Sequence, residues 1–225
     1  LIRSGQQEGL SFVNPDLTEE VKFSAGGFDA RYGDKMSSVL DITYKKPKRF
    51  EGSASGSLMG GTASIGSSVG KFTQITGFRY KSGSSLLGTM DTDAEYDPRF
   101  MDLQTYMTYT FSPKWEATFL GNFATNKYRF TPHTRETAFG TLEDSQRLTV
   151  YFPNSNENDK FQTLFGALQL SYRPKEDVLL GLQASMFNSQ EEERYDIMGE
   201  YWLSDGTDSN NGLDAGSSAM SVGRY

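Results

Sequence analysis

The chain has 225 residues, no cysteine and a formal net charge of -7, with a sequence pI near 4.9. Without cysteine it forms neither a disulfide framework nor a thiolate metal site, and so acidic a chain lacks the basic face that nucleic acid requires. Its mean hydropathy of -0.56 and the lack of any run near ~18 apolar residues exclude transmembrane helices but not β-barrels, whose strands alternate lipid-facing and lumen-facing side chains.

The N-terminal part of the chain predicts one short helix and no secretory signal. The chain opens with Leu1 and shows no initiator methionine, basic n-region or apolar h-region. We therefore expect that it carries no signal peptide of its own and has lost an N-terminal part. Residues 14–20, NPDLTEE, favour a short helix, because Asn14 can cap it, Pro15 suits the first helical position, and acidic residues lie in the first turn.

Two short strands are expected before a basic linker. They cover residues 21–23 and 39–44, and the second of them alternates apolar and polar residues. The segment between them, 24–34, is turn-rich and contains three glycines. The basic run 45–49, KKPKR, with its one proline, is interpreted as a solvated linker. It divides the chain near Phe50 into two differently patterned regions.

After this divide, four segments alternate strongly between apolar and polar residues. In residues 101–112 the odd positions are mostly apolar and the even positions mostly polar, and the same period of two recurs in 115–125, 162–173 and 178–189. Strands of roughly 11 to 12 residues are longer than those of ordinary globular sheets and match the length that crosses a bilayer at a tilt.

Three weaker strands are expected at residues 51–59, 62–69 and 72–81. The first two are built of Gly, Ser and Ala, and such small side chains facing a lumen would let another body pack closely inside. The third is ambiguous, since Arg79 has the same parity as Ile75.

The connections between these strands alternate in length. Short turns are expected at 69–71, 112–114 and 173–177. The alternate connections are long: about 18 residues follow Ser82, about 35 residues span 126–160, and a polar segment lies beyond Gln190. Short turns on one side and long loops on the other are typical of outer-membrane barrels. The turn near Gly60 is the exception, because it is tight where a long loop is expected. A soluble sandwich also explains the alternation, but it explains the strand length and loop asymmetry less well.

Residues 23–34, FSAGGFDARYGD, with SSVLDI at 37–42, resemble the C-terminal end of the plug of a TonB-dependent outer-membrane receptor. In that family a glycine and tyrosine-glycine turn precedes the last plug strand, and a short basic or polar link then enters the first barrel strand. The resemblance extends less specifically over residues 1–202. It is nearest to the branch in which a carboxypeptidase-regulatory-like domain precedes the plug.

The resemblance implies a fold, a location and a function. The fold is mainly β. Residues 1–49 form the C-terminal part of a plug domain, and residues 50–225 form about seven antiparallel strands of a transmembrane β-barrel that has about 22 strands in all. Seven strands with open edges are not expected to close a barrel. The location is the outer membrane of a Gram-negative bacterium. The function is energised uptake of a scarce, bulky solute, such as an iron chelate, a cofactor, a glycan or a peptide.

The partners that follow are outer-membrane lipid, the transported solute and the TonB energy-coupling complex. The last would bind through a TonB box that this sequence lacks, together with most of the plug. Whether a surface lipoprotein caps the receptor is left open, and neither nucleic acid nor a cofactor is expected as a partner. The solute and the residues that bind it are not assigned.

The candidate site residues all lie in the plug motif, which we define as residues 23–42. They comprise Gly26, Gly27, Arg31, Tyr32, Gly33, Asp34, Lys35 and Asp41. The resemblance makes the charged members Arg31, Asp34, Lys35 and Asp41 candidates for contacts between plug and barrel. They could equally be ordinary turn and surface charges.

Other chemistry has weaker support, and we expect no catalytic or metal-binding residues. His133 lies in a long polar segment and is interpreted as an ordinary loop histidine, and the acidic clusters 91–97 and 191–196 lack the spacing of a calcium-binding EF-hand loop. Enzymatic function is not expected. Two rival readings stay open: a small structural or adhesive outer-membrane β-barrel of about eight strands, complete in itself, and a soluble carbohydrate-binding sandwich. The sandwich predicts that the apolar faces of 101–111 and 164–172 pack against each other.

Overall fold

The computed structural model describes residues 13–27, 32, 37–83, 94–141, 145–205 and 220–224. The described residues form a mainly β structure, with one 3-10 helix, η1 (Pro15–Leu17). The strands are β1 (Thr18–Ala25), β2 (Ser38–Tyr44), β3 (Glu51–Ser57), β4 (Gly60–Val69), β5 (Phe72–Ser82), β6 (Ala94–Ser112), β7 (Trp115–Pro132), β8 (Arg135–Gly140), β9 (Ser145–Tyr151), β10 (Asn156–Lys175), β11 (Val178–Asp196), β12 (Glu200–Asp205) and β13 (Met220–Arg224). Within the described ranges, no helix has the length and apolar character needed to span a membrane.

The chain divides into two compact units. Unit 1 comprises Leu1–Lys81, Phe100–Asn126 and Phe161–Gln190, and unit 2 comprises Ser82–Arg99, Lys127–Lys160 and Glu191–Tyr225. The boundaries fall inside the long strands β6, β7, β10 and β11.

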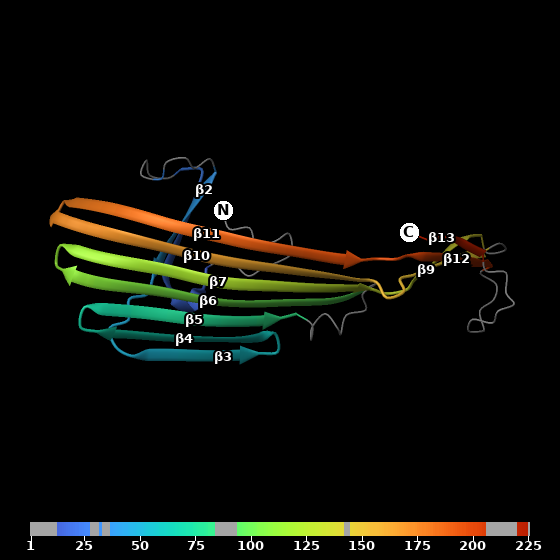
Figure 1. The fold of residues 1–225 in the computed structure, drawn as a ribbon, viewed down its shortest axis with the longest axis horizontal. Helices are drawn as coiled ribbons and strands as arrows, with labels where there is room; N and C mark the ends of the chain where they lie inside the picture. The colour runs from blue at the N-terminus through green and yellow to red at the C-terminus, as the bar shows by residue number, and fades with distance from the viewer. Residues whose placement is uncertain are drawn as a thin grey trace. The chain divides into compact units, whose positions relative to one another are not determined.

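The seven-stranded sheet has the order β11-β10-β7-β6-β5-β4-β3 (Figure 1). Neighbours such as β3 and β4, or β4 and β5, pair antiparallel in unbroken register, with Glu51 opposite Gly66 and Gly60 opposite Lys81. The seven expected strands are present, and the tight turns near residues 70, 113 and 176 are confirmed. Four strands are longer than the predicted length of roughly 11 to 12 residues: β6, β7, β10 and β11 have 19, 18, 20 and 19 residues, because polar residues extend each of them at one end. Among the described residues the sheet stays open, with β11 and β3 at its edges.

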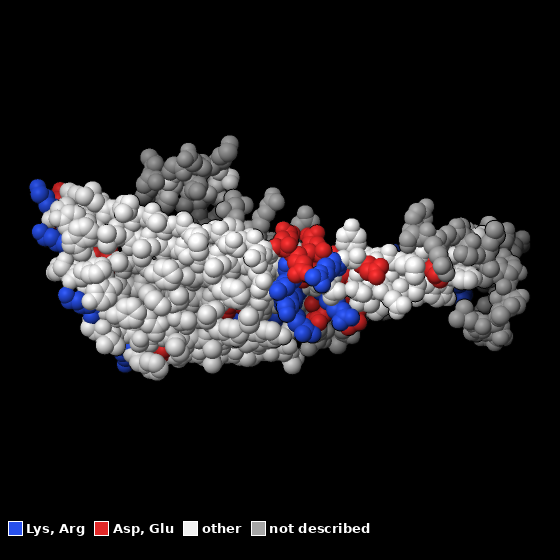
Figure 2. Space-filling model, viewed as in Figure 1, with Lys and Arg blue, Asp and Glu red and all other residues white. Residues whose placement is uncertain are grey.

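The two faces of the sheet in unit 1 are reversed relative to a water-soluble protein. Polar side chains on one face are buried: Asp102, Gln104, Thr108 and Asn122 have exposed fractions of 4% or less, and Ser64, Arg79, Thr163 and Ser171 are also buried. Large apolar side chains on the other face are exposed, among them Ile65, Phe78, Leu103, Phe111, Leu164, Leu168 and Leu182. Figure 2 shows this face almost free of charge, with basic side chains gathered at the end where the tight turns lie.

This arrangement contradicts the sandwich reading. Strands β6 and β10 both flank β7 in one sheet. Their apolar side chains, such as Leu103 and Leu168, are about half exposed at 48% and 54%. They therefore do not pack against each other, which contradicts the packing that the sandwich reading predicts.

The segment before the sheet covers its polar face. Strands β1 and β2 pair antiparallel, with Lys22 opposite Asp41, and β2 passes behind the large sheet in the view of Figure 1. A small apolar core forms there between Leu17, Tyr44 and Ile75, and the Tyr44 ring stacks on Tyr106 with centroids 4.9 Å apart. The sequence left open which face of the strand at 72–81 is buried. Ile75 and Arg79 are both buried on the same face of β5, where Ile75 belongs to this core.

Glycines allow this close approach at two positions. A Cβ atom on Gly77 of β5 would lie 2.9 Å from Leu17 Cδ2, and one on Gly66 of β4 would lie 2.5 Å from Pro47 Cγ. The expectation that small side chains let another body pack closely is confirmed for β4. It is wrong for β3, whose residues are all exposed, because the covering segment reaches β5 instead.

The expected helix at 14–20 is shorter than predicted. The Asn14 side chain accepts a hydrogen bond from the Asp16 amide at 3.0 Å, and Pro15 begins the helix as expected. The helix then ends after one 3-10 turn, since Thr18 pairs with Tyr44 and Glu20 with Thr43 across the β1–β2 ladder. Pairing with β2 satisfies these backbone groups in place of a second helical turn.

Unit 2 contains the four-stranded sheet β13-β12-β9-β8. Arg135 lies opposite Val150 in the β8–β9 pair, and Glu200 lies opposite Tyr151 in the β12–β9 pair. The expected long loops at 126–160 and beyond Gln190 are therefore largely strands, because their polar residues pair across these ladders. His133 lies exposed between β7 and β8, in one of the short connections that remain.

Candidate functional site

Part of the plug motif can be placed. Gly26 has a φ of +78° directly after β1, and its amide donates to the Ser37 carbonyl at 3.3 Å. Tyr32 donates its hydroxyl to Asp41 Oδ2 at 2.7 Å, so this carboxylate serves a contact inside the motif. Gly27 follows Gly26 without a strand assignment. The candidate residues Arg31, Gly33, Asp34 and Lys35 lie outside the described residues.

A buried arginine of the sheet, Arg79, also binds the N-terminal segment. Its Nε donates to Asp102 Oδ1 at 2.9 Å and its Nη2 to Asp102 Oδ2 at 2.5 Å, and the two side chains are only 5% and 1% exposed. A third donor, Nη1, reaches the Val13 carbonyl at 3.0 Å. One guanidinium thus neutralises a buried carboxylate on β6 and binds the backbone that enters η1.

The basic run 45–49 also contacts the rest of unit 1, which the solvated-linker interpretation did not foresee. Lys45 donates its ammonium to the Asp16 carbonyl at 2.8 Å, and Lys46 binds Glu116 Oε1 at 3.0 Å. Pro47 is buried, whereas Lys48 and Arg49 are exposed. The linker interpretation therefore holds for Lys48, Arg49 and the exposed side chain of Lys46, whereas Lys45 and Pro47 lie against η1 and the sheet.

Tyr44 sits at the centre of the covered face. Its hydroxyl is buried, and burial, with a smaller contribution from Tyr106, raises the pKa of Tyr44 to about 12, against a lowering by Arg79. Tyr44 therefore stays neutral at physiological pH. It contributes a ring contact and no charge.

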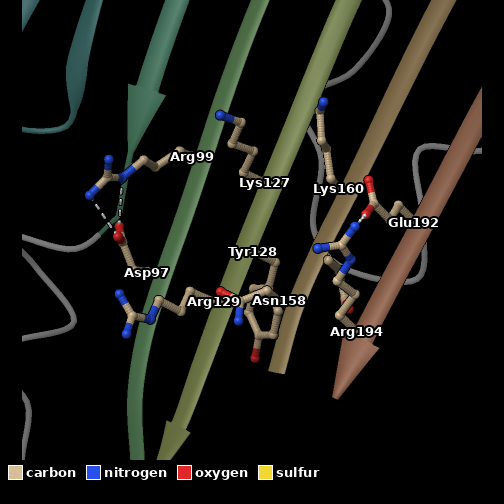
Figure 3. Close-up of a pocket in the computed structure, with 10 residues that line it drawn as sticks. Asp97, Arg99, Lys127, Tyr128, Arg129, Asn158, Lys160, Glu192 and Arg194 are labelled. Carbon is tan, nitrogen blue, oxygen red and sulfur yellow. Dashed lines mark hydrogen bonds and ion pairs between the residues drawn. The ribbon is translucent and has the colours of Figure 1, made fainter. Parts of the chain in front are cut away.

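Unit 2 contains a second candidate site, a cleft of about 380 Å³ with a largely charged lining. Figure 2 shows a patch where acidic and basic side chains gather. The lining residues of the cleft are Asp97, Arg99, Lys127, Tyr128, Arg129, Asn158, Asp159, Lys160, Glu192 and Arg194. They come from β6, β7, β10 and β11, and each strand supplies a pair of residues spaced two apart (Figure 3). Strands β7 and β10 each add the residue between their pair, Tyr128 and Asp159. Residues spaced two apart lie on one face of a strand, so the cleft is a row of charges across four strands. We call it the charged cleft.

The charges in the charged cleft are only partly paired. Arg99 binds Asp97 on its own strand, with Nη2–Oδ2 at 2.8 Å, and Arg194 pairs likewise with Glu192. Lys127, Arg129 and Lys160 form no ion pair with another residue in the part of the chain that the structure describes. The cleft therefore keeps an excess of positive charge.

Asp159 lines the same cleft but is only 6% exposed. Burial raises its pKa, and the nearby carboxylates Glu157 and Glu193 raise it further.

The sequence reasoning missed both groups of residues. Arg79 and Asp102 were detectable as charges on the inward parity of neighbouring strands. The sequence signal for the charged cleft was a set of charged residues at alternate positions, beyond the point in each strand where alternate apolar residues end. Within the described residues, no group of three or more His, Asp or Glu side chains could hold a metal ion.

Comparison with protein-family models finds no match. No curated protein and no solved structure matches the chain either.

Proposed function

We propose that this chain is the end of the plug and the first strands of the barrel of a TonB-dependent outer-membrane receptor, which takes up a bulky solute with energy supplied from the inner membrane. In this proposal residues 1–49 belong to the plug and residues 50–225 to the barrel. The observation that carries it is the N-terminal segment that lies on the buried polar face of the reversed sheet of unit 1, whose apolar face is exposed.

The exposed apolar face fits lipid as its partner. Side chains such as Leu103, Leu164 and Leu168 are each about half exposed. Complete burial of a large aliphatic side chain stabilises a protein by about 1.5–3 kcal/mol relative to full exposure to water. A contiguous apolar surface of this kind is unfavourable in water and typical of a membrane or interaction surface. Strands that alternate apolar outward and polar inward are the pattern of transmembrane barrels.

The segment on the polar face fits a plug. It is held by the Arg79 hydrogen bond to Val13, the Lys45 hydrogen bond to Asp16, the Lys46–Glu116 ion pair and the small core around Leu17. These contacts are specific and mostly polar, so they hold the segment in place while leaving the interface separable by force. Such a separation is what energised uptake requires, and the plug motif supplies the family resemblance.

The small outer-membrane barrel is the second candidate. It accounts for the reversed sheet as well as the receptor does. It does not account for residues 13–17 and 42–47, which contact the polar face that a small barrel fills with its own side chains. The receptor therefore explains more of the observed contacts.

The length of the mature polypeptide distinguishes these two candidates. Outer membranes would be isolated and the intact protein identified by mass spectrometry through peptides of this segment. A chain several times longer than 225 residues, with plug sequence before Leu1 and further strands after Tyr225, supports the receptor. A mature chain of about this length contradicts it and leaves the small barrel.

A further inference from the structure

The charged cleft holds an uncompensated group of cations on neighbouring strands. Strands β7 and β10 are adjacent in the sheet, and they supply Lys127, Arg129 and Lys160. Figure 3 shows the Lys127 and Lys160 side chains extending to the same side of these two strands. Like charges on adjacent strands repel each other, and a bound anion between them would remove that repulsion.

The position of these cations along their strands suggests where the anion comes from. In β7, Lys127 and Arg129 have odd numbers, as do the exposed residues Phe119 and Phe123 of the same strand. In β10, Lys160 has an even number, as does the exposed Leu164. The same relation holds in β6 and β11, where the charged residues share the parity of the apolar ones. On each strand the outward alternation therefore changes from apolar to charged.

In a strand whose apolar residues face hydrocarbon, the next residues of the same parity meet the lipid headgroups. We propose that the charged cleft binds the phosphate of an anionic lipid headgroup. The inference rests on the proposed function in one respect only, namely that the apolar face of the sheet lies in a membrane.

Phosphate suits the donors in this cleft. The Arg129 guanidinium presents a planar fork that matches two phosphate oxygens, and each lysine ammonium supplies a compact charge to a further oxygen. Arg99 and Arg194 are already bound to Asp97 and Glu192, so they frame the site and leave the other three cations to the ligand.

The test uses the intact protein purified from outer membranes in a non-ionic detergent, with binding followed by native mass spectrometry. The probes are phosphatidic acid, phosphatidylcholine with the same acyl chains, and inorganic phosphate. We expect phosphatidic acid to bind most tightly, because it alone combines a full anionic phosphate with acyl chains. The double variant Lys127→Gln with Lys160→Gln should weaken that binding by about 30-fold, roughly fivefold for each lysine removed.

The matched control is Lys48→Gln with Lys114→Gln, which removes the same charge from the linker and from a tight turn. It should change the affinity for phosphatidic acid by less than about twofold. Far-ultraviolet circular dichroism of both variants verifies that the strands are retained. Equal weakening by the two double variants would overturn the assignment, as would wild-type affinity in Lys127→Gln with Lys160→Gln.

The inorganic phosphate probe separates a lipid site from a site for a soluble anion. If inorganic phosphate alone binds as tightly as phosphatidic acid, the cleft takes a free anion and the lipid assignment is wrong. A mature chain of about 225 residues would contradict the receptor without affecting these affinities, since a small outer-membrane barrel also faces lipid. Failure of the cleft and failure of the proposed function are therefore distinguishable.

Discussion

Replacing Arg79 with alanine should destabilise the protein far more than removing any exposed arginine. The change removes two hydrogen bonds to Asp102 and one to the Val13 carbonyl. It also leaves the Asp102 carboxylate, whose side chain is 1% exposed, without a counter-ion. Removing one partner of a buried ion pair costs about 3–5 kcal/mol, most of it from the charge left behind.

The matched control is Arg99→Ala. Arg99 also pairs with an aspartate, Asp97, but its side chain is 56% exposed, so its loss should cost no more than about 1 kcal/mol. Arg79→Lys keeps the charge but loses the planar fork, and we expect an intermediate effect. Replacing both partners, as Arg79→Met with Asp102→Leu, should recover much of the loss, because no charge is then left unpaired in the interior.

The assay is equilibrium unfolding by urea of the purified protein in detergent micelles. Trp115, which stacks on Tyr172 at 4.3 Å between ring centroids, supplies the fluorescence signal. The free energy of unfolding is compared across the four variants. If Arg79→Ala and Arg99→Ala lower it by the same amount, or if the double replacement is as damaging as Arg79→Ala, the reasoning about the buried pair is refuted.

Two further predictions concern the covered face of the sheet. Gly77→Ala should destabilise the folded protein by about 1–3 kcal/mol through overpacking, because the added Cβ would lie 2.9 Å from Leu17. Gly56→Ala is the control and should not destabilise, because the space around Gly56 is open. The urea midpoints of unfolding of the two variants test this. The pKa of Tyr44 is raised from 10.0 to about 12 in the folded protein, so the hydroxyl stays protonated in the folded protein at a pH where it ionises in the unfolded chain. The free energy of unfolding should therefore be unaffected below about pH 10 and fall by about 2 kcal/mol as the pH rises towards 12. Tyr44→Phe should lack this part of the fall when unfolding is measured at both ends of that range, and an unchanged pH dependence would contradict the burial of the hydroxyl.

The strands of the large sheet could be predicted because alternation and burial are linked there. Residues 101–112 expose one parity and cover the other, so a period of two appears directly in the sequence. The strands β8 and β9 could not be predicted in the same way. Their residues are mostly polar, and they form strands because Arg135–Gly140 pairs with Ser145–Tyr151, a partnership that no local pattern shows.

The candidate site could be predicted less well than the fold. The parity of Arg79 and Asp102 marks each of them as an inward charge, but only the adjacency of β5 and β6 in the sheet shows that the two form a buried pair. The charged cleft depends on the same kind of information. Lys127 and Lys160 face one ligand position only because β7 and β10 are adjacent, although β8 and β9 lie between them in the chain.

The most direct test of the account asks which face of the sheet meets lipid. Because the chain has no cysteine, Leu103→Cys and Gln104→Cys each give a unique site for a spin label on the two faces of β6, in protein reconstituted in lipid bilayers. Relaxation by oxygen, which concentrates in hydrocarbon, is compared with relaxation by a water-soluble nickel chelate. The account predicts that the label at 103 is relaxed by oxygen and shielded from nickel, and that the label at 104 is shielded from both. A label at 103 that nickel relaxes strongly would place the apolar face in water and contradict the account.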